Sequence, residues 1–210
     1  MDHNKVITAT AKKALSPLGL RRQRQSRIWY DDHGWWAIVV EFQPSAWERG
    51  SYLNIGLSWM LYERSSWAFD IGHREQDFKR ASDEDQFEAA MDNVAAYAAR
   101  RVLEYRDRFS SLDQMRAHYR DLGDGSWDDY YAGVLAGLSG DRETAEQRLS
   151  LVIDAPARVT WHRALQFRCR DLVRLLAQPR SFRDSILGIV LRCRSARCLA
   201  EMPVDEIALP

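Results

Sequence analysis

The chain has 210 residues, of which 46% are hydrophobic and 29% are charged, a balance that excludes a largely disordered protein and allows one large domain or two small ones. Thirty basic and thirty acidic residues cancel, so no overall charge would attract nucleic acid or a membrane surface. An odd number of cysteines, three, and an N-terminus without the pattern of a signal peptide predict a reduced, cytoplasmic protein.

The first seventy residues predict one helix followed by an antiparallel sheet of about four strands. Apolar residues recur at helical spacing through residues 4–18, and Pro17 and Gly19 end that pattern. From Ile28 onward the apolar residues alternate with a period of two, which is the period of a β-strand. The predicted strands are residues 27–30, 35–43, 51–59 and 66–71, with a hairpin loop at 31–34 and a second loop at 44–50.

Most of the remaining chain predicts helices. A capping box at Ser82–Asp85 precedes an apolar stripe that runs to about residue 108. Shorter helices are predicted at 111–120, at about 159–177, and after the N-terminal caps Ser126, Asp141 and Ser181. The helix after Ser126 stops at Ser139-Gly140, the one after Asp141 is broken by Ala155-Pro156, and the one after Ser181 runs to about residue 198. The expected fold class is therefore α+β, with an N-terminal antiparallel sheet domain flanked by helices (1–110), a C-terminal antiparallel α-helical hairpin bundle packed on it (111–200) and a tail (201–210).

Four short motifs follow one another in the first half of the chain: Gly19-Leu20, Trp29-Tyr30, Phe42-Gln43-Pro44-Ser45 and Tyr52-Leu53-Asn54-Ile55-Gly56. This pattern resembles an uncharacterised bacterial α+β family of domains of unknown function, the DUF4304-like group, over about residues 5–110. The resemblance implies a helix–sheet–helix domain, and it implies no particular chemistry because that family has no established activity. Some small bacterial domains of this general kind act as immunity proteins against secreted toxins, and an immunity role is suggested for this chain by that analogy alone.

Residues 130–153 resemble a single tetratricopeptide-type helical hairpin. Small residues lie in its first helix, a Gly140-Asp141 turn follows, and Ala145 and Leu149 lie in the second helix. One such unit cannot bury its own apolar face, so we expect the hairpin to pack on neighbouring helices or on the sheet domain.

Two amides and an aromatic residue form the sharpest candidate site. If the strands on either side of the loop 44–50 pair as a hairpin, Gln43 comes close to Tyr52 or Asn54. On the less apolar face of a sheet, such side chains would suit a planar polar ligand or a peptide. The alternative is that Gln43 and Asn54 hydrogen-bond the loop backbone, and it is preferred because half-buried amides usually serve structure.

The tryptophans of this region divide by strand face, and four of the chain's eight lie between residues 35 and 59. Trp36 and Trp59 alternate with aliphatic residues and are expected in the core. Trp35 lies on the mixed face and Trp47 in the loop, where a tryptophan either contacts a partner or covers the end of the sheet. The predicted ligand- or partner-binding residues are Trp35, Gln43, Trp47, Tyr52 and Asn54.

Catalytic motifs are absent from the sequence, which has no Gly-rich phosphate loop, no Gly-x-Ser-x-Gly and no His-Glu-x-x-His. Asp31, Asp32 and His33 lie together in a predicted turn, where such residues are common for structural reasons. We therefore expect no catalytic residue, no metal and no cofactor. The enzymatic alternative is a small-molecule- or nucleotide-modifying site on the sheet that uses Asp70, His33 or Glu41.

The balanced total charge conceals an uneven distribution in the helical half. Residues 111–155 hold four arginines and nine acidic residues, whereas residues 156–200 hold ten arginines and two acidic residues. Pairing of these regions within or between molecules is the preferred interpretation, because no aromatic or Gly-rich elements are interleaved with the arginines. The alternative is RNA binding through Arg163, Arg170, Arg174, Arg192 and Arg197.

Together these features predict a non-enzymatic protein-binding module, with an immunity-type inhibitor of a bacterial toxin as one form of it. The expected partner is another protein, and nucleic acid is not expected. A membrane is not expected either, because the longest near-continuous apolar run, SILGIVL, has only seven residues. Nothing in the sequence indicates a small-molecule ligand or an oligomeric state.

Overall fold

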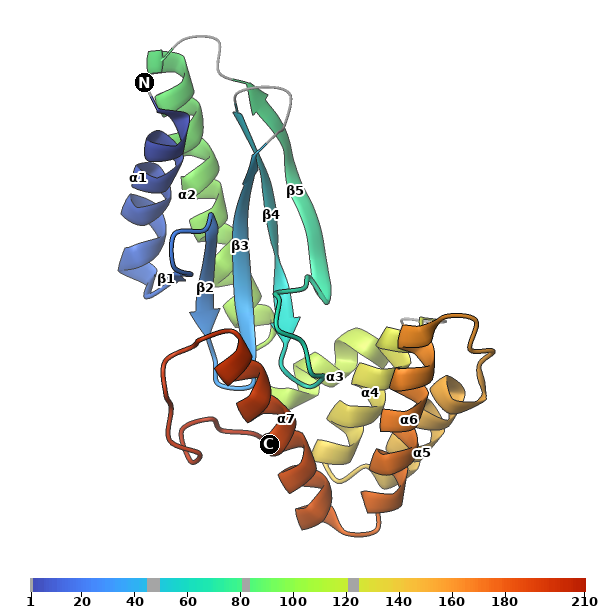
Figure 1. Ribbon diagram of the computed structural model, residues 1–210. Helices are drawn as coiled ribbons and strands as arrows, with labels where there is room; N and C mark the ends of the chain where they lie inside the picture. Colours follow the sequence, from blue (N-terminus) through green and yellow to red (C-terminus); the bar gives the residue numbers. More distant parts are fainter. Residues whose placement is uncertain (1, 45–49, 81–83, 121–124) are drawn as a thin grey trace. The chain divides into compact units, whose positions relative to one another are not determined.

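The computed structural model describes residues 2–44, 50–80, 84–120 and 125–210 (Figure 1). The chain divides into two units, one made of Met1–Trp59 and Ser66–Asp107 and the other of Met60–Ser65 and Arg108–Pro210. An antiparallel sheet at the N-terminus followed by helices confirms the α+β class.

The first unit consists of one antiparallel sheet and two long helices. Its elements are α1 (His3–Leu15), η1 (Ser16–Leu18), β1 (Arg21–Arg22), β2 (Ile28–Asp32), β3 (Trp36–Pro44), β4 (Gly50–Trp59), β5 (Ile71–Arg80) and α2 (Glu84–Arg108). The strands follow one another across the sheet in the order β1-β2-β3-β4-β5, and each pair is antiparallel. The carboxylate of Asp2 accepts from the backbone N–H of Asn4 at the start of α1, and Gly19, with φ of 87°, ends η1.

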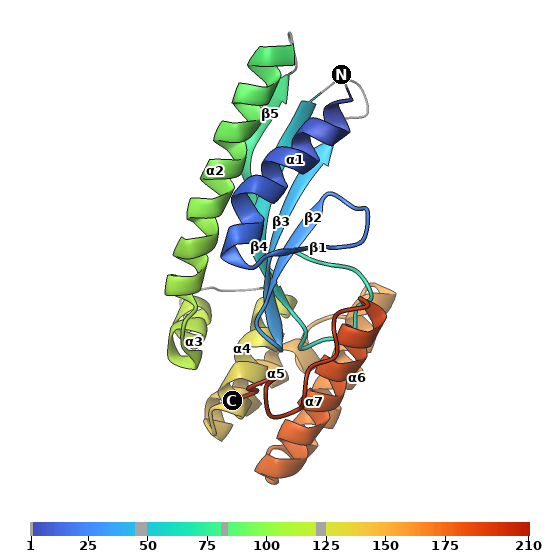
Figure 2. The same cartoon turned by 90° about the vertical axis from the view of Figure 1, so that its left-hand side faces the viewer.

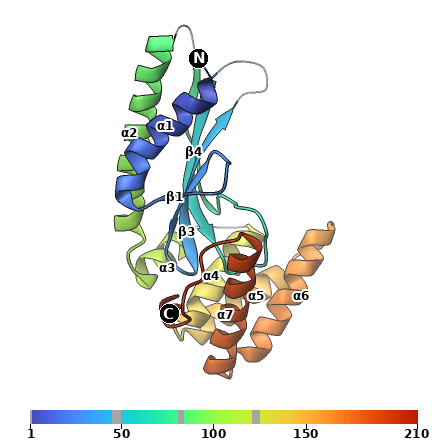
Figure 3. The same cartoon turned by 60° about the vertical axis from the view of Figure 1, so that its left-hand side comes forward.

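The core of the first unit lies between the sheet and the helices α1 and α2, which cover the same face (Figures 2 and 3). Alternate residues of β3 and β4 line that face, and each is at most 6% exposed: Trp36, Ile38, Val40, Phe42, Leu53, Ile55, Leu57 and Trp59. Large apolar side chains of both helices are buried as well, among them Ile7, Leu15, Phe87 and Met91. The expectation that Trp36 and Trp59 belong to the core is confirmed.

The predicted fourth strand is wrong. Residues 66–70 are not part of a strand, and β5 begins where that prediction ends, at Ile71. The ring of Trp67 stacks on Tyr30 with centroids 5.4 Å apart. Phe69 lies against Gly56, because a Cβ added to Gly56 would be only 3.0 Å from Cδ1 of Phe69. The alternating aromatic residues therefore cover part of the sheet face opposite the helices and do not extend the sheet.

The second unit is helical and consists of α3 (Leu112–Arg120), α4 (Ser126–Leu138), α5 (Arg142–Asp154), α6 (Thr160–Leu175) and α7 (Pro179–Ala196). Contacts join α4 to α3, α5 and α7, and join α6 to α5 and α7. Two glycines of α4 permit this close packing. A Cβ added to Gly133 would lie 2.7 Å from Cγ of Leu149, and a Cβ added to Gly137 would lie 2.5 Å from Cζ of Phe182. The small residues of the first hairpin helix thus have a packing role.

The N-terminal caps of the helices agree with the prediction from the sequence at one position and differ from it at two. Asp141 caps α5 as predicted, because its carboxylate accepts from the N–H of Thr144. The cap of α4 is Gly125 and not Ser126, whose hydroxyl lies 3.2 Å from Nε2 of His162. The last helix begins at Pro179, before the predicted cap Ser181, because proline is well suited to the first turn of a helix. The predicted capping box at 82–85 lies partly outside the described residues.

The last ten residues form no helix or strand, in line with their lack of periodicity. Ile207 and Leu209 are nevertheless buried, with exposed fractions of 0% and 4%. The tail is therefore an ordered part of the chain that carries its own apolar anchors.

Candidate functional site

Five polar residues from β3, β4 and β5 come together on the sheet face opposite α1 and α2. They are Glu41, Gln43, Tyr52, Asn54 and Arg74, here called the sheet-face cluster. The strand register places Asn54 between Glu41 and Arg74 in one row, and Gln43 directly opposite Tyr52 in the next. Because directly opposed residues share a face of a sheet, the two rows form one continuous polar surface.

Asn54 holds the centre of the sheet-face cluster and is 9% exposed. Its Nδ2 donates to Oε2 of Glu41 at 2.8 Å and to Oε1 of Gln43 at 3.0 Å. Both amide protons are therefore used to orient neighbouring side chains. Asn54 acts as a positioning residue, and the more exposed members of the cluster are the ones that a partner would reach.

Arg74 completes the cluster from the edge strand. Its Nη2 donates to Oε1 of Gln43 at 3.0 Å, and its guanidinium carbon lies 3.9 Å from the centroid of the Tyr52 ring, a cation–π distance. Since Oε1 of Gln43 accepts two hydrogen bonds, the amide is oriented with its Nε2 available to donate. Within the described residues, neither this Nε2 nor Oε1 of Glu41 has a hydrogen-bond partner.

The structure places the five predicted binding residues in three different situations. Gln43, Tyr52 and Asn54 lie together, and the Asn54 amide donates to the side chains of Glu41 and Gln43. Residues 45–49 of the loop lie outside the described residues, so the alternative that the two amides hold the loop backbone stays a prediction. Trp35 is 5% exposed and stacks on Trp59 with centroids 5.4 Å apart, so it is a core residue without a surface for a partner. Trp47 lies outside the described residues.

Sequence reasoning missed two members of the cluster as contact residues. The sequence predicts Glu41 only as a carboxylate of the enzymatic alternative, although Glu41 shares strand parity with Gln43. Arg74 could not be placed because β5 was not predicted. The signal available for it is the charged sequence GHREQDFKR, since edge strands of sheets carry charges that prevent pairing with other chains.

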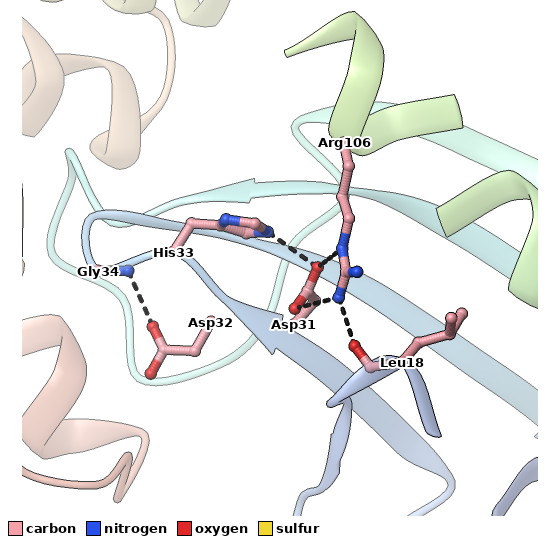
Figure 4. A network of polar contacts seen from close by, with 6 residues as sticks. All are labelled: Leu18, Asp31, Asp32, His33, Gly34 and Arg106. Carbon is pink, nitrogen blue, oxygen red and sulfur yellow. Dashed lines mark hydrogen bonds and ion pairs between the residues drawn. The ribbon is translucent and has the colours of Figure 1, made fainter. Parts of the chain in front are cut away.

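A second polar network surrounds Asp31 in the first unit (Figure 4). Arg106 of α2 donates to the Asp31 carboxylate through Nε at 2.7 Å and Nη2 at 3.0 Å, and also to the carbonyl oxygen of Leu18 at 2.6 Å. Nε2 of His33 lies 2.8 Å from Oδ2 of Asp31. Burial alone raises the pKa of Asp31, but the hydrogen bonds from His33 and Arg106 outweigh burial and hold this pKa below its usual value.

This Asp31 network is a structural clamp that joins β2, η1 and α2. The His33 ring stacks on Trp36 with centroids 3.9 Å apart, which further fixes it. The residues named for an enzymatic site have separate partners, because Asp70 accepts from the N–H of Trp59 and Glu41 accepts from Asn54. No described hydrogen bond joins His33, Asp70 and Glu41 into one acid–base set.

The helical unit contains a cavity of about 530 Å³ between α3, α4 and α5. Its lining residues are Asp113, Arg116, Tyr119, Arg120, Ala132, Ala136, Asp141, Thr144 and Arg148. Arg116 forms an ion pair with Asp141, and Arg148 forms one with Asp129 at 2.9 Å. Carboxylates therefore neutralise two of the three arginines, and the cavity holds little net charge with which to attract an anion.

The five arginines of the RNA-binding alternative do not share one surface. Arg197 is only 2% exposed, which removes it from the predicted set. Arg192 lies on α7 and forms an ion pair with Glu63. Arg163, Arg170 and Arg174 are exposed and lie on one helix, α6.

The described residues contain no group of three or more His, Cys, Asp or Glu side chains that could hold a metal ion. Among the helices in the described part of the chain, none is both long and apolar enough to cross a membrane. No family model, curated protein or solved structure matches this chain. The two resemblances drawn from sequence motifs therefore stay predictions.

Proposed function

We propose that this chain is a non-enzymatic protein-binding module and that the sheet-face cluster is its contact surface. The observation that supports the proposal is the preformed network around Asn54, which fixes Glu41, Gln43 and Arg74 before any partner arrives. Side chains held in their bound geometry lose less entropy on association. The cluster presents an acceptor, a donor and a cation next to an aromatic ring, the mixture that protein surfaces recognise.

The chemistry of the cluster defines the partner. Arg74 stacked on Tyr52 would receive a carboxylate or a backbone carbonyl group of the partner, and Nε2 of Gln43 would donate to a second acceptor. Arginine and tyrosine are also enriched among the residues that dominate binding energy at protein interfaces. A secreted bacterial toxin is the partner to which the analogy with immunity proteins leads.

The test is affinity capture from the native host with wild type and Arg74→Glu in parallel, followed by titration of each recovered protein. Arg74 is exposed, so its reversal leaves the fold intact while repelling a carboxylate. We expect Arg74→Glu to weaken binding of the specific partner by at least about tenfold. Tyr52→Ala, which removes the ring under Arg74, is expected to weaken the same interaction.

The matched control is Lys12→Glu, the same reversal of charge at an exposed position of α1. It is expected to recover the partner with unchanged affinity. Equal recovery and equal affinity for wild type and Arg74→Glu would show that the sheet-face cluster is not the contact surface.

A further inference from the structure

The solvent face of α6 carries an aromatic residue among arginines. Phe167 is 66% exposed, the largest exposed fraction of any large hydrophobic side chain among the described residues. Arg163, Arg170 and Arg174 are exposed on the same helix, and with Phe167 they form what is here called the α6 stripe. The opposite face of α6 is buried through His162, Leu165, Gln166, Cys169 and Leu172. The stripe is therefore not part of the core of the helical unit.

The spacing within the α6 stripe is that of a helix-docking seam. Its members follow one another at intervals of four, three and four residues. At 100° per residue they fall within an arc of about 60° and extend over roughly 16 Å of the helix axis. This interval pattern is how one helix presents a continuous ridge to another helix. Trp161, the other exposed aromatic residue of α6, lies about 120° away from Phe167 around the axis.

The charge of the stripe selects an acidic partner. Arg174 forms an exposed ion pair with Asp171 at 3.1 Å, whereas Arg163 and Arg170 have no ion pair with any described residue. Glu63, an acidic group in the same unit, is already held by Arg168 and Arg192. The α6 stripe thus carries a surplus of positive charge on both sides of an exposed phenylalanine.

We propose that the α6 stripe docks an acidic amphipathic helix of a partner protein. An aliphatic side chain of that helix would cover Phe167, and acidic residues one turn to either side would meet Arg163 and Arg170. Single-stranded RNA would need several stacking side chains along its path, and the stripe offers only Phe167.

The experiment uses the full chain and a synthetic helical peptide with leucine at its centre and glutamate at the heptad-spaced flanking positions. Binding is followed by fluorescence anisotropy at about 100 mM salt, where exposed charges are partly screened. We expect saturable binding that Phe167→Ala and Arg170→Glu each weaken by at least about tenfold. Both side chains are exposed, so neither substitution threatens the fold, and circular dichroism of each variant verifies this.

Two controls match these substitutions in chemistry but lie off the stripe. Leu151→Ala removes another exposed apolar side chain, on α5, and Arg180→Glu reverses another exposed arginine, on α7. Both are expected to bind the peptide within about twofold of wild type. Arg74→Glu in the first unit is also expected to leave this binding unchanged, so the result stands apart from that for the sheet-face cluster.

Three outcomes would overturn the proposal. One is the absence of peptide binding by wild type, and the second is equal binding of a scrambled peptide of the same composition, which would indicate unspecific charge attraction. The third is binding of oligouridine RNA in place of the peptide, with a loss on Arg170→Glu, which would assign the stripe to nucleic acid.

Discussion

Arg106 near the end of α2 donates two hydrogen bonds to the carboxylate of Asp31 on β2, at 2.7 and 3.0 Å. Asp31 is only 7% exposed, so removal of the guanidinium would leave a buried carboxylate with His33 alone. We expect Arg106→Ala to lower the free energy of unfolding by about 2–3 kcal/mol, less than for a fully buried pair, because solvent screens Arg106 in part. Urea denaturation followed by circular dichroism measures this loss.

The control for this substitution is Arg100→Ala on the same helix. Arg100 is exposed, and among the described residues it approaches only the ring of Tyr97, at 5.5 Å. Its removal is expected to cost at most about 0.5 kcal/mol. Equal losses for the two variants would contradict the role of Arg106 as a clamp.

The same pair predicts how stability changes with pH. The pKa of Asp31 is lower in the folded protein than in the unfolded chain, despite the opposing effect of burial. Its contribution is therefore fully present above the unfolded pKa, about 3.9, and is lost as the pH falls through the folded pKa. Asp31→Asn lacks this titration, so its difference from wild type in the free energy of unfolding should shrink between about pH 5 and pH 2. A difference that stays constant over this range would show that folding does not shift the pKa of Asp31.

The β3–β4 hairpin shows what the sequence alone could predict. Alternation of apolar residues on both sides of the loop 44–50 was enough to bring Gln43 close to Tyr52 and Asn54. Period-two patterning fixes which residues share a face once two strands pair. The sequence therefore predicts three members of the sheet-face cluster: Gln43, Tyr52 and Asn54.

Each feature of the fold that the sequence fails to predict has a physical cause. Aromatic alternation in residues 66–71 has the pattern of a strand, but tertiary packing turns Trp67 and Phe69 onto the sheet face. The true edge strand β5 is rich in charged residues, and it lacks an apolar period that would reveal it. Trp35 precedes β3 and is buried against Trp59, which strand parity could not indicate.

Asn54→Asp tests the positioning role of the central amide. The substitution removes both donors of Nδ2 and sets a second carboxylate beside Glu41. We expect a loss of about 1–3 kcal/mol in the free energy of unfolding at neutral pH. The loss should diminish as the pH falls, because protonation of either carboxylate removes their mutual repulsion. Asn93→Asp, the same change on the exposed side of α2, is expected within about 0.5 kcal/mol of wild type. Equal effects at the two positions would remove the case for a preformed cluster.

Two glycine-to-alanine substitutions in the helical unit should change stability in opposite directions. An added Cβ at Gly133 would lie 2.7 Å from Cγ of Leu149 and 3.3 Å from the carbonyl oxygen of Ala145. Overpacking there outweighs the helix propensity of alanine, so Gly133→Ala should lower stability by up to about 2 kcal/mol. At Gly188 the nearest atom is the end of the flexible Arg192 side chain, at 3.2 Å, so Gly188→Ala should raise stability by about 0.5–1 kcal/mol. Thermal denaturation measures both, and a stabilising Gly133→Ala would refute close packing of α4 on α5.

Cysteine reactivity provides a test of burial in the helical unit. Burial raises the pKa of the Cys169 thiol to about 12, and burial also raises the pKa of Cys193, whose Sγ donates to the carbonyl oxygen of Tyr62. Because the thiolate is the reactive form, both should resist alkylation at about pH 8, whereas the exposed Cys198 should react. Mass spectrometry after brief iodoacetamide treatment should therefore find one modified cysteine in the native protein and three in urea. Cys198→Ser should abolish native labelling, and rapid native modification of Cys169 would mean that α6 does not pack as described.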